Sequence, residues 1–150
     1  VSYGDILFRL HILDQLLSTD GDIVLVADAL WQDRNRNDGR ARDLMACSTP
    51  FNPGYMNDDP ASMVGIGPTL APEDADGEWI GLMKLNVAGA DAVRAELAAM
   101  SGDGSLGEAS LTDLLDRLRL SGHTISVVYI TGRWLDVDDT DDLAEAQKFL

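Results

Sequence analysis

The sequence is poor in cysteine, in basic residues and in long apolar runs, and each shortage excludes a class of protein. Cys47 is the only cysteine among 150 residues, so neither a disulfide framework nor a cysteine-based metal site can form within the chain. Its apolar surroundings predict a buried strand thiol. No apolar run approaches the roughly 20 residues of a membrane span, and no secretory signal opens the chain. We therefore expect a cytoplasmic protein without a membrane partner.

Basic residues number 11 against 26 acidic ones, which gives a formal net charge of −15. Such a surface repels phosphate backbones, so a nucleic-acid partner is not expected. General solubility, or a high-salt or acid-rich proteome, accounts for most of this acidity. A functional role for the remaining acids has to be argued cluster by cluster. The hydrophobic fraction of 45% is enough for one core, and we expect residues 1–150 to form a single domain.

The opening residues predict an α/β arrangement. Residues 1–4 resemble the end of a strand, and residues 6–17 carry apolar side chains at helical spacing. Residues 22–28 are apolar on both faces, which is typical of a buried parallel strand. Strand, helix and strand in this order predict a βαβ unit. Further strands are expected at 42–48, 62–67, 78–85 and 124–131, further helices at 88–100, 111–120 and 142–150, and polar loops at 33–42 and 49–60.

Asp5 is the first candidate metal ligand. It follows the first predicted strand, at the edge of the sheet where ligands bind in open α/β folds. A carboxylate at this position can hold Mg²⁺, which prefers oxygen ligands. The alternative is that Asp5 is only the N-cap of the helix predicted at 6–17.

Asp136 and Asp138 form the second candidate group. Alternation along residues 135–138 places both carboxylates on one face, where they repel each other unless a cation or water separates them. The following acids have a structural explanation, because Asp139 or Thr140 can cap a final helix with further acids in its first turn. The tail lacks the glycine and closing glutamate of an EF-hand calcium loop.

Four segments carry a resemblance to a known family. They are YGDILF at 3–8, DIVLVAD at 22–28, GEWIGLMKL at 77–85 with Gly-Ala at 89–90, and GRWLDVDDTDDLAEA at 132–146. Together they resemble bacterial choline-phosphate cytidylyltransferases. They are most similar to the cytidylyltransferase domain that is fused to phosphoenolpyruvate phosphomutase in phosphonate biosynthesis.

The resemblance implies a Rossmann-like α/β fold and transfer of CMP from CTP to a phosphonate or phosphate-ester acceptor such as 2-aminoethylphosphonate. It implies that Asp5 and Asp138 bind Mg²⁺, assisted by Asp136. The metal would position and neutralise the phosphoryl groups. No residue is assigned a catalytic role, and neither histidine is given one.

The resemblance also indicates where the acceptor binds. Lys84 would meet its negative head group and Glu78 its cationic amine, unless the two are merely an exposed pair on a strand. Asp28 and Trp31 follow a strand and would line the acceptor pocket, although a core position is the alternative for Trp31.

The Gly-rich segment and following lysine that grip the nucleotide in this family are absent from the chain. We therefore expect an incomplete nucleotidyltransferase fold that lacks its N-terminal nucleotide-binding part, about 90 to 100 residues in ordinary domains of this type. Alone, the chain would be inactive. Exposed strand edges would favour self-association or association with the missing half. The alternative is a non-catalytic binding or assembly module with the same fold.

Overall fold

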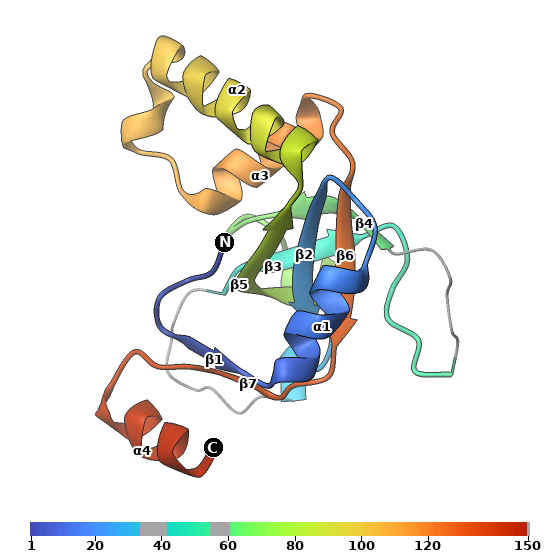
Figure 1. Ribbon diagram of the computed structural model, residues 1–150, viewed down its shortest axis with the longest axis vertical. Coiled ribbons are helices and arrows are strands. Elements are labelled where there is room, and N and C mark those ends of the chain that lie inside the picture. The colour runs from blue at the N-terminus through green and yellow to red at the C-terminus, as the bar shows by residue number, and fades with distance from the viewer. Residues whose placement is uncertain (34–41, 55–60, 150) are drawn as a thin grey trace.

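A computed structural model describes residues 1–33, 42–54 and 61–149. Most of the predicted loop at 33–42 and the second half of the predicted loop at 49–60 lie outside the described residues. The centre of the molecule is a closed barrel of five strands in the order β2-β5-β3-β4-β6 (Figure 1). These strands are β2 (Ile23–Asp28), β3 (Leu44–Cys47), β4 (Ala61–Ile66), β5 (Gly77–Leu85) and β6 (Ile125–Ile130).

The expected Rossmann-like α/β fold is wrong. Only β2 and β6 pair in parallel, and the other four strand pairs of the barrel are antiparallel. The reason lies in the connections, because a parallel pair needs a long crossover, usually a helix, between its strands. The segments from β3 to β4 and from β4 to β5 contain no α-helix in their described parts, only a short 3₁₀ turn at Pro72–Asp74. Antiparallel pairing follows, and it closes the sheet.

The opening βαβ unit is also wrong. Instead of one helix at 6–17, the chain forms β1 (Ile6–Phe8) and then α1 (Leu10–Ser18). Strand β1 pairs antiparallel with β7 (Trp134–Asp136) in a separate two-stranded sheet. The residues before β1 run antiparallel beside β5 through a bridge between Ser2 and Leu82.

Two groups of buried side chains hold these elements together. The main cluster joins the barrel to α2 (Val87–Asp103) and α3 (Leu111–Leu120). The second cluster joins α1 to the other face of β2, and Ile6 and Phe8 pack against it. Burial of both faces of β2 confirms the prediction made for that strand.

The helices α2, α3 and α4 agree with the sequence pattern. Helix α4 (Thr140–Phe149) ends the described chain close to where the pattern predicts it. Cys47 is a buried strand thiol, as expected, and burial raises its pKa to about 11. No described helix has both the length and the apolar character needed to cross a membrane.

Gly81 allows β5 to bend beside Tyr3. Its φ is +77°, and a Cβ at this position would lie 2.1 Å from Cδ2 of the Tyr3 ring. The Tyr3 ring packs in turn on Trp79, with a centroid separation of 5.2 Å. The Tyr3 amide donates to the Gly81 carbonyl over 3.0 Å. Only glycine combines this backbone conformation with so close a neighbour.

We expect Gly81→Ala to lower the free energy of unfolding by more than about 2 kcal/mol, because strain at positive φ adds to overlap with an aromatic ring. Gly102→Ala is the matched control, since a Cβ there meets no atom within 4 Å and the residue lies inside α2. Alanine at that helical position should raise stability by about 0.5 kcal/mol. Urea denaturation of both variants tests the difference, and equal stabilities would contradict the account of Gly81.

Candidate metal centre

Three carboxylates from the two ends of the chain meet at the β1–β7 sheet. The pairing places Ile6 opposite Asp136. One step further, the Val137 amide donates to the Asp5 carbonyl over 2.9 Å. One oxygen each from Asp5, Asp136 and Asp138 lies within 4.8 Å of the others. The structure therefore brings together all three residues that the sequence singled out as metal ligands.

The structural explanation offered for Asp5 is wrong. Helix α1 begins at Leu10, and its N-cap is Arg9. Asp5 instead lies before β1 and is exposed. Its carboxylate is thus not needed to cap a helix, and its position beside Asp136 has to be explained in another way.

The predicted cap of the last helix is confirmed. The amides of Asp141 and Asp142 donate to Asp139 Oδ1 over 2.8 and 3.0 Å. The carboxylate of Asp142 reaches back and accepts from the amides of Asp138 and Asp139 over 3.0 and 3.3 Å. This reciprocal arrangement is a capping box. It fixes the backbone of Asp138 where the chain leaves β7.

The three carboxylates form a donor set that fits a hard divalent cation. All the donors are oxygens, which Mg²⁺ and Ca²⁺ prefer. Opposite ligands around Mg²⁺ are about 4.2 Å apart when each bond is about 2.1 Å. The 4.8 Å limit on the separation of the carboxylate oxygens is close to this value. Like charges at such separations repel, and a cation between them would remove that repulsion.

Tyr3 and Asp43 form a polar wall beside the three carboxylates. The Tyr3 hydroxyl donates to Asp43 Oδ2 over 3.0 Å. Burial raises the pKa of Tyr3 well above its ordinary value, and the charges of Asp43, Asp5 and Asp136 raise it further. Burial also raises the pKa of the Asp43 carboxyl, an effect that the Tyr3 hydrogen bond partly offsets. Tyr3 is therefore a neutral hydrogen-bond donor at physiological pH.

Asp28, predicted to line the acceptor pocket, is fully buried at the end of β2. Its Oδ1 accepts from the amides of Leu30 and Gly132, each over 3.0 Å. Its Oδ2 accepts from Trp134 Nε1 over 2.9 Å. These bonds tie the end of β2 to the turn between β6 and β7. The geometry gives Asp28 a structural role, and an acceptor-binding role stays a prediction.

The structure does not bring Glu78 and Lys84 together. They lie six residues apart on β5, roughly 20 Å along a regular strand. Glu78 is only 6% exposed, so an exposed strand position is the wrong description of it. The Lys84 ammonium donates to the carbonyls of Leu17 and Thr19 at the end of α1. Its contact with an acceptor stays a prediction.

Trp31 lies in a short 3₁₀ turn after β2 and is 7% exposed. Its carbonyl accepts from Arg42 Nη1 over 3.0 Å, and the guanidinium lies 5.6 Å from the centre of the indole ring. The core position considered for Trp31 is confirmed by this burial. A contact with the acceptor stays a prediction.

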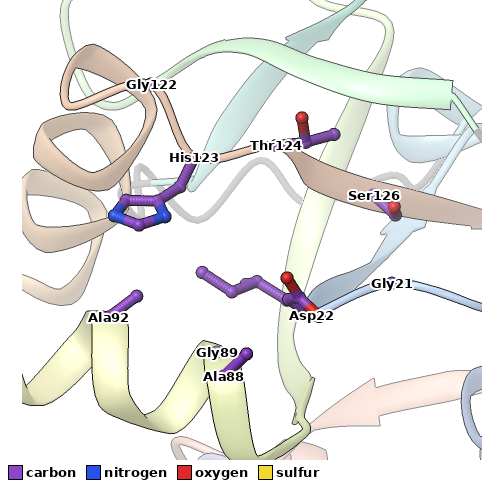
Figure 2. Close-up of a pocket in the computed structure, with 10 residues that line it drawn as sticks. Gly21, Asp22, Ala88, Gly89, Ala92, Gly122, His123, Thr124 and Ser126 are labelled. Atoms are coloured by element: carbon purple, nitrogen blue, oxygen red, sulfur yellow. The ribbon is translucent and has the colours of Figure 1, made fainter.

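Two cavities lie away from the three carboxylates. The larger, about 400 Å³, separates the start of α2 from the segment that leads into β6 (Figure 2). His123 points toward Ala92 on α2, and Thr124 and Ser126 line the side of the cavity formed by β6 and the residue before it. Asp22 also lines this cavity, and its carboxylate accepts from the Asn86 side chain over 2.7 Å.

The smaller cavity, about 230 Å³, lies at the far end of β6 and includes His11 and Arg133 in its wall. The sequence pattern predicted no role for either His11 or Arg133. The only local signal was a glycine, Gly132, directly before an arginine at the end of a predicted strand.

We expect Asp28→Ala to lower the free energy of unfolding by about 3 kcal/mol or more, because three hydrogen-bond donors, one of them the buried Trp134 indole, would lose their acceptor. Asp20→Ala, at an exposed position, is the control and should change stability by less than about 0.5 kcal/mol. The measurement is urea denaturation at pH 7. A loss below about 1 kcal/mol for Asp28→Ala would contradict the role given to this carboxylate.

Comparison with known proteins shows what the fold is similar to. No protein-family model and no curated protein sequence matches the chain. A solved structure, the inositol-1-phosphate CTP transferase from T. maritima, is similar with a TM-score of 0.63 at 17% sequence identity. The match covers 99% of this chain and 52% of that one, so the chain spans about half the length of the structure it matches. The chain thus has the fold of about half of a solved CTP transferase.

Proposed function

We propose that this chain is the metal- and acceptor-binding part of a nucleotidyltransferase that joins CMP from CTP to a phosphonate such as 2-aminoethylphosphonate. The observation that carries the proposal is the convergence of Asp5, Asp136 and Asp138 from opposite ends of the chain. Likeness to half of a CTP transferase supports cytidylyl transfer. The motifs at 77–85 and 132–146 support a phosphonate acceptor.

Asp5, Asp136 and Asp138 would hold a divalent cation such as Mg²⁺. When bound, the ion would neutralise the triphosphate and help to align it with the acceptor. The chain's own contribution is positioning, because the β1–β7 ladder and the α4 capping box fix the backbone on either side of the carboxylates. The neutral Tyr3 hydroxyl adds a polar wall without adding charge.

The proposed reaction requires little proton transfer. An oxygen of the phosphonate attacks the α-phosphorus of CTP, a new P–O bond forms, and pyrophosphate leaves. The phosphonate oxygen is already anionic near neutral pH, so it needs no general base to remove a proton. Positioning and charge neutralisation then account for most of the rate increase.

Acceptor recognition is assigned to the barrel end where β2 and β5 meet. The register places Asp28 opposite Glu78 there. We assign the ammonium group of the acceptor to Glu78 and an aromatic contact to Trp31. Asp28 would support this region through the structural hydrogen bonds described above, whereas Lys84 lies at the opposite end of the β2–β5 ladder and would meet the negative head group only of an acceptor that reaches that end.

Removal of one carboxylate should weaken metal binding. We expect Asp5→Asn and Asp138→Asn each to raise the dissociation constant for Mn²⁺ at least tenfold, measured by calorimetry on this chain. Asp141→Asn is the matched control, since it removes the same charge three residues from Asp138 but outside the cluster. Its affinity should stay within twofold of the wild type. Equal losses of affinity in all three variants would mean that Mn²⁺ is attracted by the general negative charge of the protein and that the cluster is not a specific site.

The transfer reaction is tested in the full gene product that contains this chain. With CTP, 2-aminoethylphosphonate and Mg²⁺, we expect pyrophosphate release whose kcat/KM falls at least 100-fold in Asp5→Asn and Asp138→Asn. Asp141→Asn should retain at least half of the activity. Metal binding with no pyrophosphate release from any acceptor of this class would contradict the proposal and favour a non-catalytic binding module.

A further inference from the structure

The smaller cavity has an unusual wall for so acidic a protein. It lies at the carboxyl end of β6 and is bounded by α1, through His11 and Gln15, and by the turn at Arg133. None of the described residues that line it is acidic. The rings of Phe51 and Tyr129 form another wall, with their centroids 5.7 Å apart. In a chain with 26 acidic and 11 basic residues, this wall offers an arginine, a histidine and an amide without a competing carboxylate.

Arg133 differs from the other arginines in the described part of the chain. Arg94, Arg117 and Arg119 form ion pairs with neighbouring acids. Arg42 donates to the Trp31 carbonyl, and Arg9 lies over the Phe149 ring. No hydrogen bond, ion pair or ring contact joins the Arg133 side chain to any described residue, and its guanidinium is left to a ligand or to water.

The backbone presents Arg133 in a conformation that arginine rarely adopts. Its φ is +67°, and it is the only non-glycine residue with positive φ in the described ranges. The surroundings impose this geometry, because buried Asp28 accepts from the Gly132 amide and the Arg133 carbonyl accepts from the Arg9 amide over 3.1 Å. Backbone outliers that are held in this way concentrate at binding sites.

We propose that this cavity binds a small oxyanion of the phosphate class, with the Arg133 guanidinium as its main partner. The planar guanidinium fork matches two oxygens of a phosphate or phosphonate. The His11 ring and the Gln15 amide supply further donors from α1. Phe51 and Tyr129 give an apolar surface for an organic group attached to the anion.

The oxyanion site is separate from the three carboxylates. None of Asp5, Asp136 and Asp138 is among the described residues that line the smaller cavity. The proposal therefore goes beyond the transfer reaction, and it holds or fails without the metal.

The test is a titration with inorganic phosphate, at constant ionic strength and without divalent metal, followed by NMR of the histidine rings and arginine side chains. We expect saturable shifts at His11 and Arg133 in the wild type. Arg133→Gly should weaken phosphate binding at least tenfold and should still fold, because glycine relieves the positive φ. Arg94→Gln removes the same charge at an exposed, ion-paired position and should bind phosphate like the wild type.

Two results would overturn the oxyanion site. One is a set of shifts that do not saturate and that spread evenly over the exposed arginines. The other is phosphate binding by Arg133→Gly with wild-type affinity. A parallel titration with phenylphosphonate distinguishes the sources of the anion. If phenylphosphonate binds at least threefold more tightly than phosphate, the site is for an organic phosphonate or phosphate ester. If the two affinities are equal, the site is for inorganic phosphate.

Discussion

The antiparallel pairing of β1 with β7 is the interaction on which the candidate metal centre depends. Only three residue pairs form this sheet, yet it joins the first and last strands of the chain. Without it, Asp5 would have no fixed position relative to Asp136 and Asp138. The pairing is supported from one side by Ile6 and Phe8, which pack on the second core cluster. From the other side it is supported by the capping box of α4, so burial and backbone hydrogen bonds together set the carboxylate positions.

Asp28 links this sheet to the barrel. Its carboxylate holds the Gly132 amide and the Trp134 indole, and Trp134 is the first residue of β7. A buried carboxylate is stable only when hydrogen bonds satisfy it, and three donors do so here. The same bonds fix the turn that presents Arg133 to the smaller cavity. One buried side chain thus helps to position both the strand that carries Asp136 and the turn of the proposed oxyanion site.

The sequence predicted most strands and helices, because each carries its own periodicity and end signals. The pairing of the strands could not be predicted in the same way. The positions of β3, β4 and β5 were predicted correctly, but their antiparallel closure into a barrel depends on contacts between segments that are distant in the sequence. Residues 6–8 were misassigned because their apolar spacing continues into the pattern of α1, and tertiary packing decides between strand and helix there. The acidic cluster was predicted from motif resemblance and alternation in the tail. Arg133 was missed because its conformation comes from Asp28, 105 residues earlier in the sequence.

The most direct test of the central claim is paramagnetic line broadening by Mn²⁺ in amide NMR spectra of this chain. If Asp5, Asp136 and Asp138 hold one ion, the amides of Asp5 and Ile6 and those of Asp136 to Asp138 should broaden together. They should do so at Mn²⁺ concentrations well below one equivalent, before amides near exposed acids elsewhere, such as Asp91 on α2. Broadening of the tail alone, or of all exposed acids in parallel, would contradict a metal centre built by the β1–β7 sheet.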